Sequence, residues 1–180
     1  MDNLIDEYFD KSYITSLLCE LSYAFYSFLY QCIIFPTILS SSILTVLNSS
    51  DIDKDIIKII NIVVNAINTI LLAINSNFKL NDRYNHFHTM KIKFTALNHR
   101  IESDKNKKIN DNSFIINIDD IINSFDNLYN DLVYQFPSHI KTKVITKYGK
   151  SKKLPNSLAV ECETPKVNQL NIDVDVVSFQ

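Results

Sequence analysis

The sequence contains very little glycine: Gly149 is the only one among 180 residues, alongside four prolines and no tryptophan. Glycine supplies the positive φ angles that phosphate-binding loops, dinucleotide-binding fingerprints and tight β-hairpins need at several positions. The single glycine therefore excludes, for this chain, the classes of fold and binding site that are built on such turns. Its length suits one domain, or a small domain with a tail.

Cysteine is also scarce, and positive charge is not in excess. Cys19, Cys32 and Cys162 form no CxxC pair, which argues against a disulfide framework or a structural zinc site and favours reduced thiols. The net charge of −2 gives no overall positive field, so no specific nucleic-acid partner is expected. Residues 1–20 are acidic, the reverse of the basic start of a signal peptide, and are interpreted as an amphipathic arm.

Charge is missing altogether from two long stretches. Residues 21–50 are 30 consecutive residues without Asp, Glu, Lys or Arg, and residues 59–78 are another 20. As a helix, the first stretch would extend roughly 45 Å, which exceeds the bilayer core of about 30 Å. The pattern predicts an all-α protein with a transmembrane hairpin over residues 21–78, whose spans lie at about 24–47 and 57–77. The alternative is a buried hairpin in a soluble helical protein.

The second span carries four asparagines, and an unpaired amide in hydrocarbon costs on the order of a kilocalorie per mole or more. Steps of four, three and seven residues place them along one side of a helix, while aliphatic side chains cover the other sides. This polar stripe consists of Asn61, Asn65, Asn68 and Asn75. The first span has its own polar residues at helical intervals: Ser27, Gln31, Ser41, Thr45 and Asn48. We expect the two stripes to face each other or a shared water-filled axis.

Pro36 lies near the middle of the first span, where the missing backbone donor predicts a helix kink. The orientation of such a hairpin follows from the basic residues that flank it. The loop between the spans offers only Lys54 and Lys58, whereas residues 79–108 contain eight basic residues. This asymmetry predicts a two-pass protein with both termini in the cytosol.

After the second span, apolar residues continue at steps of three and four without proline or glycine, which predicts that the second helix extends into the cytosol. This coiled-coil-like seam comprises Leu80, Tyr84, Phe87, Met90, Phe94, Leu97 and Ile101. A second apolar series over residues 118–132 predicts another helix, with Asn117 as its N-cap. Residues 79–108 are basic and residues 109–131 carry five aspartates, so the two helices are expected to pair antiparallel within a cytosolic helical region over residues 79–150.

Lysines form a cluster after the second of these helices: Lys141, Lys143, Lys147 and Lys150. Such a basic patch suits an anionic membrane surface or a phosphorylated ligand, and a solvated helix face is the alternative. Residues 151–180 are interpreted as a flexible tail. No catalytic, metal-binding or cofactor-binding set is found, because His86 and His88 point to different sides of a helix and no carboxylate has HExxH spacing. We therefore expect no enzyme activity and no cofactor.

Four segments, taken in order, resemble a known family. They are IIFPTILSSSI at 33–43, FKLNDRYNHFHTMKIKFTALNHRIE at 78–102, IINSFDNLYNDL at 121–132 and FPSHIKTKVITKYGK at 136–150. This order is similar to that of the SLATT family, membrane effectors with two transmembrane helices that occur beside bacterial nucleotide-signalling genes and in large DNA viruses. Serines at 40–42 occupy the place where the family often has a glycine.

The resemblance implies an oligomeric membrane protein that forms or regulates a pore, in which the asparagine stripe either lines water or joins subunits. The composition favours the branch encoded by large DNA viruses, in a host or virion membrane. One alternative is a structural scaffold without channel activity, which ties a cellular or virion bilayer to a protein partner through the cytosolic helices. A soluble helical interaction domain is the third.

Overall fold

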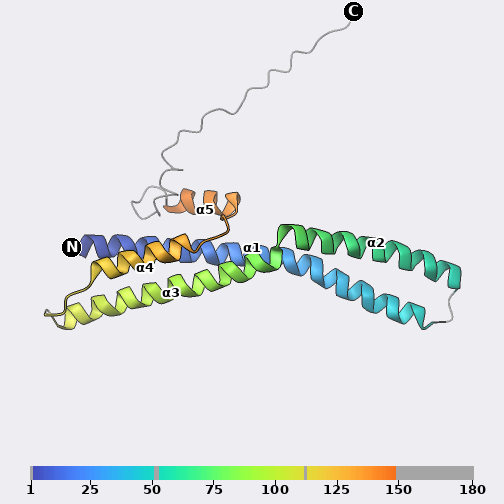
Figure 1. Ribbon diagram of the computed structural model, residues 1–180, viewed down its shortest axis with the longest axis horizontal. Coiled ribbons are helices and arrows are strands. Elements are labelled where there is room, and N and C mark those ends of the chain that lie inside the picture. The colour runs from blue at the N-terminus through green and yellow to red at the C-terminus, as the bar shows by residue number, and fades with distance from the viewer. Residues whose placement is uncertain (1, 51–52, 112, 149–180) are drawn as a thin grey trace, which may run out of the picture.

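A computed structural model describes residues 2–50, 53–111 and 113–148. These described residues form five helices and no strand, which confirms the all-α class. The helices are α1 (Asp2–Asn48), α2 (Lys54–Phe78), α3 (Leu80–Asn110), α4 (Ile118–Asn130) and α5 (Ser138–Tyr148). Figure 1 shows an elongated molecule with two parts. The head comprises the first half of α1 with α3, α4 and α5, and the hairpin comprises the second half of α1 with α2.

α1 joins the two parts as a single helix of 47 residues. At 1.5 Å per residue it extends roughly 70 Å. The acidic arm therefore continues into the first apolar span without a break, since no glycine or proline precedes Pro36. The first half of α1 lies along α3 and the second half along α2 (Figure 1).

Pro36 does not end α1. Because proline has no N–H, the carbonyl of Cys32 loses its usual helical donor. The neighbouring Thr37 keeps its hydroxyl within the helix, where it donates to the Ile33 carbonyl at 2.8 Å. Figure 1 shows α1 bent between the half beside α3 and the half beside α2.

The sequence predicts one continuous helix from the second span through the seam. In the structure α2 passes directly into α3, but the helix is interrupted at Lys79. The φ and ψ angles of Lys79 are 48° and 44°, in the left-handed region, and its N–H points to the carbonyls of Asn75 and Ser76. α3 begins at the next residue, Leu80. The cause is tertiary. α3 packs along the first half of α1 and α2 along the second half, and α1 is bent between them (Figure 1). A single straight helix over α2 and α3 would lose contact with α1 at one end.

The predicted seam forms the core of the head. Its central residues are all buried: Phe87, Met90, Phe94, Leu97 and Ile101. They pack chiefly against the first half of α1, whose buried apolar residues include Ile5, Ile14, Leu18 and Cys19. The partner expected from the sequence, the helix near residues 118–132, covers the remaining side through Ile121 and Phe125. The acidic arm is thus an integral part of the head.

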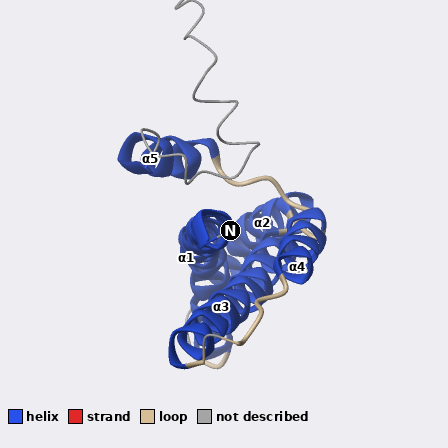
Figure 2. Cartoon of the chain, turned by 90° about the vertical axis from the view of Figure 1, so that its left-hand side faces the viewer, coloured by secondary structure: helices blue, strands red, loops and turns tan. Residues whose placement is uncertain are grey.

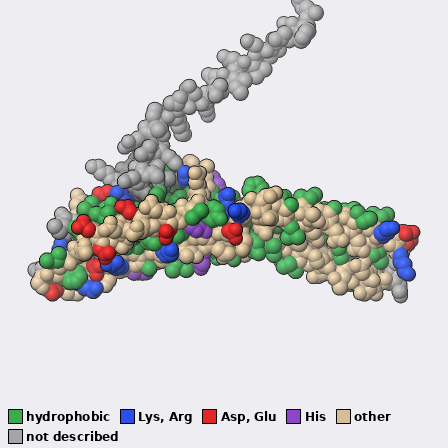
Figure 3. All heavy atoms as spheres, in the orientation of Figure 1, with side chains coloured by type: hydrophobic (Ala, Val, Ile, Leu, Met, Phe, Trp, Pro, Cys, Tyr) green, Lys and Arg blue, Asp and Glu red, His purple; other side chains and the backbone are tan. Residues whose placement is uncertain are grey.

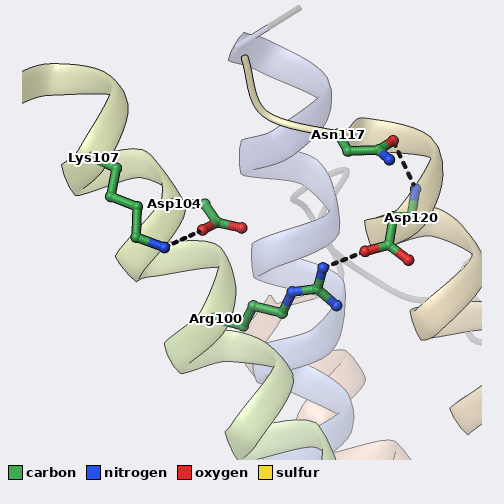
Figure 4. Close-up of polar contacts among 5 residues, drawn as sticks. All are labelled: Arg100, Asp104, Lys107, Asn117 and Asp120. Carbon is green, nitrogen blue, oxygen red and sulfur yellow. Dashed lines mark hydrogen bonds and ion pairs between the residues drawn. The ribbon is translucent and has the colours of Figure 1, made fainter. Parts of the chain in front are cut away.

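α4 runs antiparallel to α3, as the opposite charges of the two segments predict. Lys93 pairs with Asp131 at 3.3 Å, and Arg100 pairs with Asp120 (Figure 4). Asn117 caps α4 as predicted, because its side-chain oxygen accepts the Asp120 N–H at 3.3 Å. Exposed ion pairs of this kind contribute little individually, so they set the register of α4 more than its stability.

α5 packs on the side of α1 that faces away from α3 (Figure 2). Two of its own residues, Ile140 and Val144, are buried, as is Phe136 in the segment that precedes it. The ring of Phe136 stacks on Phe87 with centroids 5.5 Å apart, which ties α5 to the main core. α5 therefore closes the head at the end that adjoins the hairpin (Figure 1).

Candidate membrane-spanning hairpin

The hairpin turns large apolar side chains outward on both helices. Phe35 and Val46 of α1 are 69% and 70% exposed, and Ile62 of α2 is 61% exposed. Figure 3 shows charged side chains over the head and at the loop end of the hairpin, with none over the surface between them. Both helices are long and apolar enough to cross a membrane. Contiguous exposed apolar surface of this kind marks a membrane or partner-binding region in a folded protein.

Two amide hydrogen bonds join the helices of the hairpin, one between the helices near the middle and one exposed near the loop end. Asn68 is only 9% exposed, and its Oδ1 accepts the Ser40 hydroxyl at 2.9 Å. Asn61 donates its Nδ2–H to Asn48 Oδ1, also at 2.9 Å. Asn75 lies half-buried toward α1 as well, although its buried Oδ1 has no partner among the described residues. Two bonds between side chains on different helices thus fix the register of α1 against α2.

The predicted stripe of four asparagines is divided by the structure. Asn61, Asn68 and Asn75 face α1, whereas Asn65 is exposed. With about 100° of rotation per residue, Asn65 lies about 40° to one side of Asn61 and farther from the other two, which moves its amide off the α1 contact. Within the described residues, the Asn65 side chain has no hydrogen-bond partner.

The polar residues predicted on the first span meet α2 only in part. Asn48 reaches Asn61, but Ser41 and Thr45 are exposed and donate their hydroxyls to carbonyls four residues back in α1, at 2.8 and 3.0 Å. Ser40 does bond to the asparagine stripe of α2, but the sequence pattern does not distinguish it from its neighbours. Only the antiparallel register of the two helices, with residues 40 and 68 opposite each other, identifies it.

Exposed hydroxyls in the hairpin are satisfied within their own helices. Ser42 donates to the Ile38 carbonyl at 3.0 Å, and Thr69 donates to the Asn65 carbonyl at 2.8 Å. Serine and threonine side chains that bond back to the preceding turn need no water. The exposed hydroxyls of the hairpin therefore need no partner from hydrocarbon, whereas the exposed amides of Gln31, Asn65 and Asn77 have no hydrogen-bond partner among the described residues.

Tyrosines gather where the hairpin meets the head. The ring of Tyr84 lies 5.6 Å from Tyr30 and 5.9 Å from Tyr23, measured between centroids. The Tyr26 hydroxyl accepts a hydrogen bond from Arg83 at 3.0 Å, and the Arg83 guanidinium also lies over the Tyr26 ring. Tyrosine is enriched at membrane–water interfaces because its ring is apolar and its hydroxyl is polar. This tyrosine cluster marks one candidate boundary of a bilayer.

The loop end of the hairpin is polar. α2 begins after Asp53, whose side chain accepts the Asp55 N–H at 2.9 Å. Lys54 and Lys58 follow in the first turns, and with Asn61 they line an open groove between the ends of the two helices. Charged residues at this end and tyrosines at the other leave an uncharged surface between them.

The histidines of the head take part in packing and hydrogen bonding. His86 Nε2 accepts the Val133 N–H at 3.3 Å. Burial lowers the pKa of His86, and Lys93 lowers it further, while Asp131 acts in the opposite direction. The remaining three histidines lie beside other side chains: His88 beside Tyr23, His139 beside Phe25 and His99 beside Glu102. In the part of the chain that the structure describes, no group of three His, Cys, Asp or Glu residues is placed to hold a metal ion.

The predicted basic patch falls largely on α5. Lys143 and Lys147 are exposed and Lys141 is half-buried, and the Lys147 ammonium lies 5.2 Å from the Tyr148 ring centroid. Lys150 lies outside the described residues, as does the tail over residues 151–180.

The fold and the hairpin define the class of protein: an all-helical chain with two candidate membrane-spanning helices joined to a helical head. Comparisons with protein-family models, with curated proteins and with solved structures find no match for the chain. The resemblance to the SLATT family therefore rests on the order and pattern of the sequence segments. Functional proposals depend on the geometry of the hairpin.

Proposed function

We propose that this chain is an integral membrane protein whose hairpin crosses a bilayer twice and holds the head at one surface. The observation that carries the proposal is the uncharged, outward-facing apolar surface between the tyrosine cluster and the loop lysines. In water, leaving one large aliphatic side chain exposed forgoes about 1.5–3 kcal/mol of burial free energy, and the hairpin exposes many of them. Immersion in hydrocarbon removes that penalty along the whole hairpin.

The dimensions of the hairpin match a bilayer. Residues 30–48 of α1, from the tyrosine cluster to the loop end, rise roughly 27 Å, and the 25 residues of α2 rise roughly 37 Å. The hydrocarbon core is about 30 Å thick. The inner amide bonds also suit this setting, since polar side chains that pair between helices are the usual means of joining membrane spans.

The charges at the two ends favour an orientation with the head in the cytosol. Lys79, Arg83, Lys91 and Lys93 lie within about fifteen residues of the tyrosine boundary, whereas Lys54 and Lys58 are the basic residues at the loop end. Cytosolic flanks carry the excess of lysine and arginine in membrane proteins. Both ends of the described chain leave the hairpin on the head side, so the proposed topology has both termini in the cytosol.

Pore formation is the second candidate function, and the resemblance to the SLATT family implies it. The amides of Asn61 and Asn68 form hydrogen bonds to α1, so in this arrangement they are poor candidates for lining water. Asn65 and Thr69 are exposed polar residues of α2 beside its contact with α1, and a pore assembled from several copies would take its polar lining from this exposed part of α2. A scaffold without channel activity is the alternative if the copies meet without leaving a path for water.

Membrane insertion and topology are tested together. The full chain, with Cys32→Ser and Cys162→Ser, receives a single new cysteine at Ser50 or at Ile115, which is 85% exposed in the head. We expect the protein to resist carbonate extraction and the two cysteines to react with an impermeant maleimide from opposite sides of sealed vesicles. Cys19 does not interfere, because burial raises the pKa of its thiol to about 12. Release by carbonate contradicts insertion, and labelling of both sites from one side contradicts the topology.

Dye leakage from liposomes separates a pore from a scaffold. A pore lined by this exposed part of α2 predicts that the wild type releases dye and that Asn65→Leu releases markedly less. Ile67→Leu is the matched control, since Ile67 is exposed at a similar depth and carries no polar group. The absence of leakage from wild-type protein that resists carbonate favours the scaffold.

A further inference from the structure

We infer that the groove at the loop end of the hairpin binds an anionic phospholipid through its phosphate, an inference that rests on the proposed membrane insertion. The groove lies between the ends of α1 and α2. Its volume is about 790 Å³, within the range of about 300–1,000 Å³ that is usual for small-molecule sites. Its described lining includes two lysines, three asparagines and two isoleucines, so it combines cationic, hydrogen-bonding and apolar groups.

The first observation is the charge of the groove. Lys54 and Lys58 both line it, and their spacing of four residues puts them on one side of α2. Among the described residues, neither ammonium has a carboxylate partner, and no acidic side chain lines the groove. Asp53 lies beside the groove, where it caps α2 by accepting the Asp55 N–H. The described lining thus carries two positive charges, which attract an anion into a concave site.

The second observation is a set of hydrogen-bond donors that the described chain leaves unused. Asn61 donates to Asn48 Oδ1, so the Nδ2 of Asn48 still has its hydrogens available. The Asn65 amide, which also lines the groove, has no hydrogen-bond partner among the described residues. Ammonium and amide groups donate to phosphate and ester oxygens, and a phospholipid carries both kinds of acceptor.

The third observation is the depth of the groove in the proposed bilayer. The uncharged stretch of α2 between Lys58 and Lys79 is 20 residues long and rises roughly 30 Å, which matches the hydrocarbon core of about 30 Å. Lys58 therefore lies at the level of the headgroups, and Asn65 lies roughly 10 Å deeper. Ile57 and Ile62 provide apolar walls along this path.

This sequence of groups matches the parts of a phospholipid in order. Its phosphate lies against the lysines, its ester carbonyls reach the asparagines, and its acyl chains lie along the isoleucines and the outward surface of the hairpin. Free phosphate would use only the first of these contacts. An anionic headgroup such as phosphatidylglycerol is favoured over phosphatidylcholine, because the choline group carries a positive charge that the lysines repel.

The test uses tryptophan reporters at matched depth in the full chain, which has no tryptophan of its own. Ile62→Trp lies in the groove, and Val46→Trp lies on α1 outside the groove lining at nearly the same depth, since Asn48 bonds to Asn61. Each protein is placed in phosphatidylcholine liposomes with a fixed fraction of brominated phosphatidylglycerol or brominated phosphatidylcholine. Phosphatidylglycerol should quench Ile62→Trp more strongly, and the two lipids should quench Val46→Trp equally. Equal quenching of Ile62→Trp by both lipids overturns the inference.

Charge substitutions in the Ile62→Trp protein identify the cause of the preference. Lys54→Gln with Lys58→Gln removes two charges from the groove, and Lys143→Gln with Lys147→Gln removes the same charge from exposed positions of α5. A lysine at a membrane surface favours an anionic lipid by about fivefold. The first pair should therefore abolish the preference for phosphatidylglycerol, and the second pair should leave it unchanged. An equal loss with both pairs contradicts a site in the groove.

Inorganic phosphate separates a lipid from a soluble ligand. Added to the liposomes, it should leave the quenching of Ile62→Trp unchanged relative to chloride at equal ionic strength. Recovery of the fluorescence with phosphate alone would show that the groove takes soluble phosphate, and the inference of a lipid site would be wrong.

Membrane insertion and the lipid site fail in different ways. If carbonate releases the wild-type protein, insertion fails and the lipid site fails with it. If the protein resists carbonate but shows no preference for phosphatidylglycerol at Ile62→Trp, only the lipid site fails. A preference that requires Lys54 and Lys58 in carbonate-resistant protein supports both.

Discussion

Asn68 and Ser40 illustrate how single polar residues act between two apolar helices. Each would be costly alone in hydrocarbon, but together they form a bond of 2.9 Å that is shielded by the surrounding helices. Measured interhelical bonds of this kind average only about 0.6 kcal/mol in membranes. Their main effect is to select one register for the hairpin, because sliding α1 so that Leu44 takes the place of Ser40 would leave Asn68 buried without a partner.

His86 is the residue whose protonation should affect the head. Its Nε2 accepts the Val133 N–H, which requires the neutral ring, and its pKa is lowered from 6.5 by burial and by Lys93. The unfolded chain therefore binds this proton more readily than the folded chain. The contribution of neutral His86 to the free energy of unfolding is fully present above about pH 6.5. It is lost as the pH falls from 6.5 through the lower pKa that His86 has in the folded chain.

Thermal unfolding of the protein in detergent, measured at pH 7.5 and at pH 5.5, checks this prediction. The wild type should lose more stability at pH 5.5 than His86→Gln, whose side chain accepts a hydrogen bond without titrating. His99→Gln is the control, because His99 is exposed and no hydrogen bond to it is seen in the described head. An identical pH dependence for the wild type and His86→Gln contradicts the role of His86.

Among the elements, α1 determines how the others are placed. α3 lies along its first half, α2 lies along its second half, and α5 covers a further side (Figure 1). Because α1 is bent, the α2–α3 segment must change direction at the junction between the two parts. Lys79 makes that change at the first residue after the uncharged span, and its left-handed conformation is unfavourable for a side chain with a Cβ by about 1–2 kcal/mol.

Lys79→Gly should therefore stabilise the protein, since glycine adopts the left-handed conformation without the Cβ clash. We expect an increase of about 1 kcal/mol in the free energy of unfolding, partly offset by the greater freedom of glycine in the unfolded chain. Chemical unfolding in detergent measures the difference. Asn77→Gly is the control, because it places glycine within α2, where it should destabilise by about 1 kcal/mol. A loss of stability with Lys79→Gly would indicate that the Lys79 side chain has a further role.

At the scale of the whole molecule, the head and the hairpin have opposite surfaces. The head buries a core of apolar residues and bears ion pairs outside, such as Lys91 with Glu20 at 2.8 Å. The hairpin exposes many apolar residues and buries the Ser40–Asn68 hydrogen bond between its helices. This inversion is expected when one end of a molecule is solvated by water and the other by lipid.

The absence of tryptophan makes this division directly measurable. Phe35→Trp in the hairpin should emit at short wavelength in liposomes and be quenched by brominated lipids. Ile115→Trp in the head should emit as a water-exposed residue and be quenched by iodide. The two sites have similarly high exposure in the isolated chain, so a difference between them reports the solvent. Matching emission from both sites would contradict an embedded hairpin.

The sequence by itself determined the helical class, the two uncharged stretches, the buried seam from Phe87 to Ile101 and the cap at Asn117. Each of these depends on side-chain periodicity or on a local backbone bond, which neighbouring residues along the chain specify. Only the tertiary structure decided that α1 runs unbroken through both parts, that Lys79 separates α2 from α3, and that the Asn65 amide is exposed while Asn61 and Asn68 bond to α1. These features depend on which surfaces of distant helices meet, because a helical pattern defines the faces of each helix but contains no information about the partner that each face contacts.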